Sequence, residues 1–517
     1  MSSSARRPPW PFLLILLVAL LLVPVALAVV YYQESNPPEF VEPPVEAADA
    51  ATVRDFCTKC HAYPEPSSFP RAEWAREVGQ AYRFAAEAGL VRTAPRQASV
   101  IKYFETNSPE ELPRLPELPD SPRWPVKFER RNLSLGESKS TPIVTSAKLV
   151  ALTGSTASEM LVCDMRTQRI LYANLDNADM RWRAVATGSY PVRVELVDLD
   201  QNGRRDFLVS NMGVHYPSDD LLGSVVWHRG EVGGFTPITL LEGVGRVVDV
   251  KALDVEGDGK LDLLVAIYGW RKTGEIVLLR NRTTDWTTPK FVAEVIDKRH
   301  GSIELAVADL NGDGKPDFVS AFGQEHEQVV TYLNDGSGGF KSQTVYAAPL
   351  PSFGTAAFQL ADLDRDGDLD IVLANGDILD PPTLLKPYHG LQWLENTGTG
   401  TAFTSHRIGD LHGVMASAVA DFDGDGDLDI VGVTYIPDGH IPDRVRQRLP
   451  AVVLYEQTTT GQFTPHVLSR GDCDYLSCSA AVLPGDKLPS LLVGNGCFVN
   501  ANRKLSAVSI WRNRGRP

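Results

Sequence analysis

The chain has 517 residues, of which 43% are hydrophobic and 22% charged, and its formal net charge is −15 at pH 7. That length allows more than one domain, each with an apolar core of its own. Because no basic block offsets the negative charge, the composition argues against nucleic acid or anionic lipid as a partner.

Residues 1–32 have the features of a membrane anchor. Arg6 and Arg7 precede an uncharged apolar stretch, residues 12–32, which is long enough to cross a bilayer as a helix. The basic flank predicts that the rest of the chain lies outside the cytoplasm, in the periplasm, held to the inner membrane. The alternative is a secretory signal cleaved near residues 26–28, which would release the exported chain.

Residues 33–50 are rich in proline and glutamate and contain little that could be buried. This composition is typical of a semi-extended tether. We therefore expect a spacer that holds the following segment, residues 51–118, a short distance from the membrane.

Residues 57–61 read Cys-Thr-Lys-Cys-His. Cys-x-x-Cys-His is the spacing at which two thiols attach covalently to a haem and the histidine becomes the proximal iron ligand. A redox dithiol would need a βαβ context, which is absent. A zinc site would need a second Cys/His pair nearby, whereas the next cysteine is Cys163. The motif therefore predicts haem c bound through Cys57, Cys60 and His61.

A short helix is expected to end at this motif, and two more are expected over residues 71–89 and 96–106. Together with the motif, this arrangement resembles class I cytochromes c, which implies a small all-α electron-transfer module. One feature departs from that family, because no methionine lies between His61 and Met160. The usual sixth iron ligand is therefore missing from the module.

Three alternatives for the sixth position remain open. The iron is open, or it carries a weak ligand such as Tyr82 or a lysine, or a histidine from later in the chain reaches it. His215 and His326 are the candidates for that last role.

An acidic pattern occurs five times, and its starts are separated by 56, 55, 53 and 59 residues. An apolar strand precedes each copy, and three further strands follow it. Four strands in such a period indicate one blade of a β-propeller. Residues 142–187 and 478–514 supply two more blades without the acidic pattern, so we expect seven blades, with six or eight as alternatives. The last blade lacks its final strand, and residues 126–133 are predicted to complete it and close the ring.

These acidic loops and their period resemble FG-GAP/VCBS repeats, the integrin-type calcium-binding propeller family. The resemblance covers residues 124–514. The expected fold is therefore mainly β: a propeller of about seven blades, preceded by the cytochrome c-like module and an N-terminal transmembrane helix.

Each acidic loop places side-chain oxygens at positions 1, 3, 5 and 9 and glycine at position 6. Calcium requires six to eight oxygens around a tight turn, and glycine permits that turn. Magnesium fits less well, because it retains its waters and demands a stricter octahedron. We expect about five Ca²⁺ sites that pin the first two strands of their blades. The predicted ligands are Asp198, Asp200, Asn202 and Asp206; Asp254, Glu256, Asp258 and Asp262; Asp309, Asn311, Asp313 and Asp317; Asp362, Asp364, Asp366 and Asp370; and Asp421, Asp423, Asp425 and Asp429.

Four cysteines remain outside the haem motif, namely Cys163, Cys473, Cys478 and Cys497. Export permits disulfides, and three of these residues lie close together in sequence. One or two bridges are therefore expected near the C-terminus.

The combined features predict a membrane-tethered c-type cytochrome whose propeller is a docking surface for an unidentified redox partner at the cell envelope. A second hypothesis is a calcium-dependent binding propeller for glycan or protein, with the haem as a sensor. A third is a haem-linked oxidoreductase. No catalytic residue is predicted, because the sequence has no nucleophile motif or phosphate-binding loop. Residues 325–327 and 387–390 are polar stretches that could line a central channel.

Overall fold

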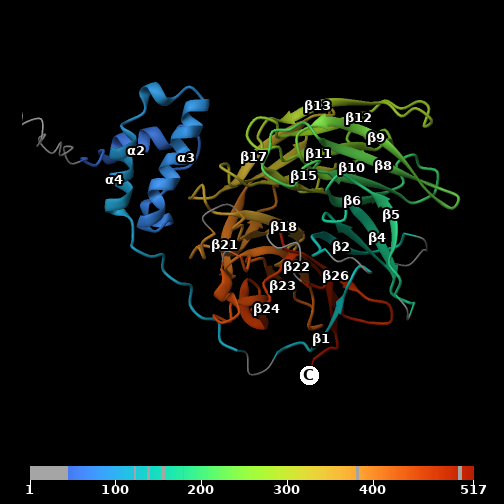
Figure 1. Ribbon diagram of the computed structural model, residues 1–517. Coiled ribbons are helices and arrows are strands. Elements are labelled where there is room, and N and C mark those ends of the chain that lie inside the picture. The colour runs from blue at the N-terminus through green and yellow to red at the C-terminus, as the bar shows by residue number, and fades with distance from the viewer. Residues whose placement is uncertain are drawn as a thin grey trace, which may run out of the picture.

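The computed structural model describes residues 45–120, 124–136, 140–152, 158–177, 180–379, 383–439, 441–498 and 504–516. A small helical segment lies beside a ring of seven four-stranded antiparallel sheets (Figure 1). The predicted transmembrane stretch, residues 12–32, and most of the tether lie outside the described residues. Within the described ranges, no helix combines the length and apolar character needed to cross a membrane.

The helical segment contains three α-helices and three short 3-10 helices before the ring. Their bounds are α2 (Ala50–Cys57), η1 (Pro66–Ser68), η2 (Arg71–Glu73), α3 (Trp74–Glu87), η3 (Val91–Thr93) and α4 (Gln97–Asn107). The side chain of Asp49 caps α2 by accepting a hydrogen bond from Thr52 N at 2.9 Å. Trp74 of α3 stacks on Phe104 of α4 with ring centroids 3.9 Å apart, and both rings are buried. This stacked pair is the centre of a small apolar core.

The seven sheets are the blades of a propeller, numbered here along the chain. Blade 1 is β2 (Val144–Val150), β3 (Glu159–Asp164), β4 (Arg169–Asn174) and β5 (Arg183–Thr187); blade 2 is β6 (Pro191–Val197), β7 (Asp206–Asn211), β8 (Gly223–Glu231) and β9 (Gly234–Val244); blade 3 is β10 (Val247–Leu253), β11 (Asp262–Ile267), β12 (Glu275–Asn281) and β13 (Phe291–Asp297); blade 4 is β14 (Ser302–Ala308), β15 (Asp317–Phe322), β16 (Gln328–Asn334) and β17 (Phe340–Ala347); blade 5 is β18 (Thr355–Ala361), β19 (Asp370–Asn375), β20 (Gly390–Asn396) and β21 (Phe403–Asp410); blade 6 is β22 (Val414–Ala420), β23 (Asp429–Thr434), β24 (Pro450–Thr459) and β25 (Gln462–Arg470); blade 7 is β26 (Tyr475–Val482), β27 (Pro489–Asn495), β28 (Val508–Asn513) and β1 (Phe128–Leu133).

The first strand of every blade touches the first strands of both neighbouring blades, so these seven strands surround the central channel. The second strands are buried along their whole length, as in β7, β11 and β15. Their sequences are accordingly almost continuous apolar runs after the leading aspartate, because both faces pack against neighbouring blades.

The predicted closure of the ring is confirmed. Strand β1 pairs antiparallel with β28 in the last blade, in a register that sets Phe128 opposite Asn513 and Leu133 opposite Val508. The count of seven blades is confirmed as well. Without β1, strand β28 would form an open edge of blade 7. Its pairing with β1 covers that edge, although the two strands are more than 370 residues apart in the sequence.

The expected disulfides are wrong in this structure, where no disulfide joins any two of the six cysteines. The Cys473 Sγ atom lies 3.7 Å from the carbonyl oxygen of Pro450, and Cys478 packs against an apolar cluster between blades 6 and 7. Proximity in sequence does not bring these thiols together, because they lie on different strands and loops of a twisted blade.

Replacing Leu133 tests the contribution of the closing strand. Leu133 is buried against Val144 and Val508, so Leu133→Ala should lower the free energy of unfolding by about 3 kcal/mol. The measurement is urea denaturation. Arg131→Ala, on the same strand but exposed, is the control and should change stability little. Equal effects of the two substitutions would contradict a structural role for this strand.

Candidate metal and cofactor sites

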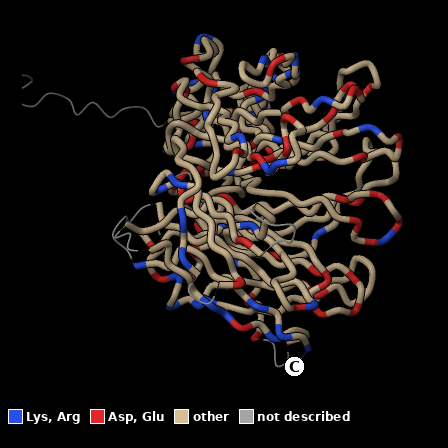
Figure 2. Tube along the Cα trace, turned by 90° about the vertical axis from the view of Figure 1, so that its right-hand side faces the viewer, with Lys and Arg blue, Asp and Glu red and all other residues tan. Residues whose placement is uncertain are grey.

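All five acidic loops lie at the same end of the ring. Each loop joins the first and second strands of its blade, in blades 2 to 6. The glycine at position 6 has a positive φ in each loop, as at Gly203 (82°) and Gly426 (102°), which is the conformation that the sequence pattern predicts. Figure 2 shows Asp and Glu residues interspersed with Lys and Arg on the loops that project from the ring.

The aspartate at position 1 organises its own loop. Asp198 accepts hydrogen bonds from Asn202 N at 2.9 Å and from Gly203 N at 2.8 Å. The same contacts recur at the start of the second and third loops, and the position-6 contact recurs in the last two. These backbone contacts curl the loop so that its other side-chain oxygens can face a common point.

The aspartate at position 9 has a second role that sequence reasoning missed. Asp206 is buried and accepts hydrogen bonds from Leu199 N at 3.0 Å and from Gly230 N at 2.7 Å. Its carboxylate therefore ties the acidic loop to the end of the third strand. The corresponding residues of the third, fourth and fifth loops make the same pair of contacts.

Burial disfavours the ionised form of these position-9 carboxyls. It raises the pKa of Asp370 to about 6 and that of Asp429 to about 7, despite the backbone amides that stabilise the ionised form. A bound divalent cation would favour the ionised form again.

Three loops bring carboxylate oxygens from three residues within 4.8 Å of one another. These groups are Asp198, Asp200 and Asp206; Asp362, Asp364 and Asp370; and Asp421, Asp423 and Asp425. One buried oxygen of Asp200 and one of Asp362 have no hydrogen-bond partner. Oxygen-only groups of this kind are compatible with calcium.

The second and third loops differ from the other three. Glu256 is held by Arg280 at 3.2 Å and by Arg282 at 3.0 Å, which turns the position-3 carboxylate toward guanidinium groups. In the third loop an amide, Asn311, stands at position 3. Among the described residues, neither loop assembles a group of three carboxylates at that distance.

The Cys-x-x-Cys-His motif begins at the last residue of α2. Cys57 is half-buried against the apolar cluster that contains Trp74 and Phe104, whereas Cys60 is exposed. Burial raises the pKa of the Cys57 thiol to about 11. His61 Nδ1 lies 2.6 Å from the carbonyl oxygen of Ala62. With Nδ1 as the donor, Nε2 becomes the nitrogen able to bind a metal.

The three side chains named for the sixth position make other contacts in the structure. The Tyr82 hydroxyl donates to the carbonyl oxygen of Pro95 at 2.5 Å. His215 stacks on Tyr190, with 5.0 Å between ring centroids. His326 lies against His300 at 4.7 Å.

The end of the ring opposite the acidic loops carries a second group of titratable residues. His300 Nε2 lies 2.9 Å from Glu325 Oε2, and His326 is adjacent. Glu327 is buried and accepts hydrogen bonds from Gly354 N at 3.1 Å and from Thr355 N at 2.8 Å. The sequence singled out residues 325–327 but not His300, which comes from the loop between blades 3 and 4.

The helical segment docks on this same end. Arg271, in the loop between β11 and β12, forms an ion pair with Glu87 at 2.6 Å and lies 3.6 Å from the ring of Phe84. Lys386, in the loop between β19 and β20, lies 5.8 Å from the ring of Phe69. Both loops join second to third strands, and in an antiparallel blade these emerge at the end opposite the loops that join first to second strands.

Comparison with known proteins agrees with the repeat pattern and with the strands that carry it. The family model described as an FG-GAP-like repeat matches residues 198–265, 268–373 and 384–432. Over these residues the ring is similar to FG-GAP-like repeats. The matched residues include all five acidic loops, end within β23 of blade 6, and leave out blades 1 and 7.

The comparisons with curated proteins and with solved structures give little further information. No curated protein matches the chain. Among solved structures the chain is similar to one described as "Structure of Dos1 propeller", with 9% identity, 72% of this chain and 77% of that chain covered, and a TM-score of 0.41. A structural similarity with so low a TM-score supports no argument about function.

Removal of calcium tests the acidic loops. Saturating Ca²⁺ should raise the free energy of unfolding relative to chelator, by about 2.7 kcal/mol for each site occupied at a hundred times its dissociation constant. Asp364→Asn removes a clustered oxygen and should reduce this gain. Asp368→Asn is the matched control, because it removes the same charge from the same loop outside the cluster. Urea denaturation with and without Ca²⁺ measures both, and an equal loss in the two variants would contradict the ligand assignment.

The buried carboxyl of Glu327 predicts a pH dependence. Burial raises its pKa in the folded protein to about 7 from an ordinary value of 4.5. Its contribution to stability is therefore fully present below pH 4.5 and is lost as the pH rises through about 7, by roughly 3 kcal/mol in total. Urea denaturation from pH 4.5 to 8 should show this loss in the wild-type protein but not in Glu327→Gln. Parallel pH profiles for the two proteins would contradict it.

Proposed function

We propose that the protein is an exported, calcium-stabilised FG-GAP propeller that carries a covalent haem on its helical segment and transfers electrons at the cell envelope. The observation that carries this proposal is the geometry of residues 57–61. The Cys57 thiol at the end of α2 and the Cys60 thiol three residues later precede a histidine whose Nδ1 is held by a backbone carbonyl, which leaves Nε2 for an iron. Haem, when bound, supplies a reversible one-electron centre.

The chain's own residues would hold and shield that centre. Cys57 and Cys60 would provide the two covalent links, and the hydrogen bond from His61 to Ala62 would fix the orientation of the imidazole. The buried rings of Trp74 and Phe104 would exclude water from one side. Low solvent access favours a stable reduction potential over reaction with small molecules.

The propeller's part in this proposal is to hold the haem segment in place and to present a docking surface. The ion pair of Arg271 with Glu87 and the contact of Arg271 with Phe84 attach α3 to blade 3. On the opposite end, calcium would stiffen the loops without competing for that contact. Residues 12–32 would anchor the assembly in the inner membrane, with residues 33–50 as the spacer.

A second candidate function is calcium-dependent binding of a protein or glycan by the propeller. The observation in its favour is an exposed apolar loop between β7 and β8, where Tyr216, Leu221 and Leu222 are 54%, 57% and 56% exposed. Exposed apolar side chains that gather in one loop are typical of a contact surface. The same loop would serve a redox partner in the first proposal.

The deciding experiment is to express the full chain in a host that matures c-type cytochromes and to record its spectrum after denaturation. Covalently bound haem should stay with the wild-type polypeptide and be lost in the Cys57→Ser, Cys60→Ser double variant. Cys163→Ser is the control and should retain the haem. A wild-type protein without covalent haem would refute the cytochrome proposal and leave the calcium-dependent binding propeller.

A further inference from the structure

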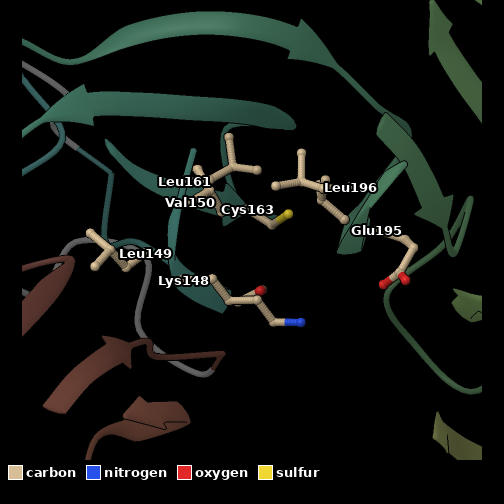
Figure 3. Close-up of a pocket in the computed structure, with 9 residues that line it drawn as sticks. Lys148, Leu149, Val150, Leu161, Cys163, Glu195 and Leu196 are labelled. Atoms are coloured by element: carbon tan, nitrogen blue, oxygen red, sulfur yellow. The ribbon is translucent and has the colours of Figure 1, made fainter. Parts of the chain in front are cut away.

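A cavity of about 260 Å³ opens in the wall of the central channel, between blades 1 and 2 (Figure 3). The side chains of Val150, Leu161 and Leu196 form an apolar wall, together with Cys163. Lys148 and Glu195 stand at its other side. The cavity is therefore amphipathic, with a charged edge and an apolar interior.

The charged edge belongs to a larger cluster in the channel. Six charged side chains from four neighbouring first strands take part: Lys148 of β2, Arg193 and Glu195 of β6, Asp249 and Lys251 of β10, and Glu304 of β14. Three are cations and three are carboxylates, so the cluster is neutral when all are ionised.

Every carboxylate of the cluster already has a cation beside it. Lys251 Nζ lies 3.2 Å from Glu195 Oε2 and 3.5 Å from Asp249 Oδ1. Arg193 Nη2 lies 3.4 Å from Glu304 Oε2, and its Nη1 donates to the carbonyl oxygen of Ile303 at 2.8 Å. Arg193 and Lys251 therefore form the ion pairs with all three carboxylates.

Lys148, the third cation of the cluster, takes no part in these ion pairs. Within the part of the chain that the structure describes, its amine makes no hydrogen bond and no ion pair. The side chain is exposed to solvent on the channel strand β2. Partial desolvation by the neighbouring channel residues, together with the nearby positive charge of Lys251, lowers the pKa of Lys148. An anionic oxygen placed beside the amine would relieve both effects.

We propose that this cavity binds a small organic monocarboxylate, whose carboxylate pairs with Lys148 and whose short aliphatic tail lies against Val150, Leu161 and Leu196. The volume exceeds what one water molecule needs on the same measure, roughly 10–15 Å³, by enough to hold such a tail. A dianion is disfavoured, because Glu195 and Asp249 stand nearby and only one amine is unpaired.

Calorimetric titration of the full-length, calcium-loaded protein with butyrate, hexanoate and octanoate tests this site. At least one of the three should bind, and the corresponding neutral amide should bind about tenfold more weakly or worse, because it lacks the charge. Lys148→Met should weaken carboxylate binding by a similar factor. Lys341→Met, which removes an exposed lysine from β17, is the control and should bind as the wild type does.

A second measurement needs no variant. Limited acetylation followed by peptide mapping should modify Lys148, and the carboxylate that binds should protect Lys148 while leaving Lys341 unprotected. The proposal is overturned if none of the three carboxylates binds the folded wild-type protein, if the Lys148→Met protein binds them equally well, or if Lys148 is not protected.

Discussion

The arrangement of this protein depends on one backbone pairing, that of β1 with β28. This strand pair joins residue 128 to residue 513 and turns a row of seven sheets into a ring. Only in a closed ring do the first strands of all blades face one channel, and only then does β2 of blade 1 meet β26 of blade 7. The loops at each end of the ring, and the channel between them, are consequences of that closure.

The antiparallel order within each blade places the acidic loops and the contacts of the helical segment at opposite ends of the ring. Metal binding at Asp198, Asp364 or Asp423 would therefore stiffen the ring without touching Arg271 or Lys386, where the helices dock. A calcium-dependent scaffold and a separately docked module are compatible in this geometry.

Several features could be predicted from the sequence because they are local. The positive φ at Gly203 follows from a loop of fixed length, and the strand at residues 128–133 could be assigned to the last blade because that blade lacked one. The second role of Asp206 could not be foreseen, since its partner Gly230 lies 24 residues away at the end of another strand. The disulfides were wrong for the same reason: sequence distance says little about where thiols point in a blade.

The sequence by itself determined the repeat, the positions of the acidic loops and the Cys-x-x-Cys-His motif, because each depends on residue type and spacing within a short stretch. The tertiary structure alone decided which charges meet in the channel. Lys148, Arg193 and Lys251 are separated by about fifty residues each and carry no local pattern, and only the radial packing of first strands brings them together. It likewise decided that Lys148 is the amine left unpaired, because pairing is settled by three-dimensional distance and not by composition.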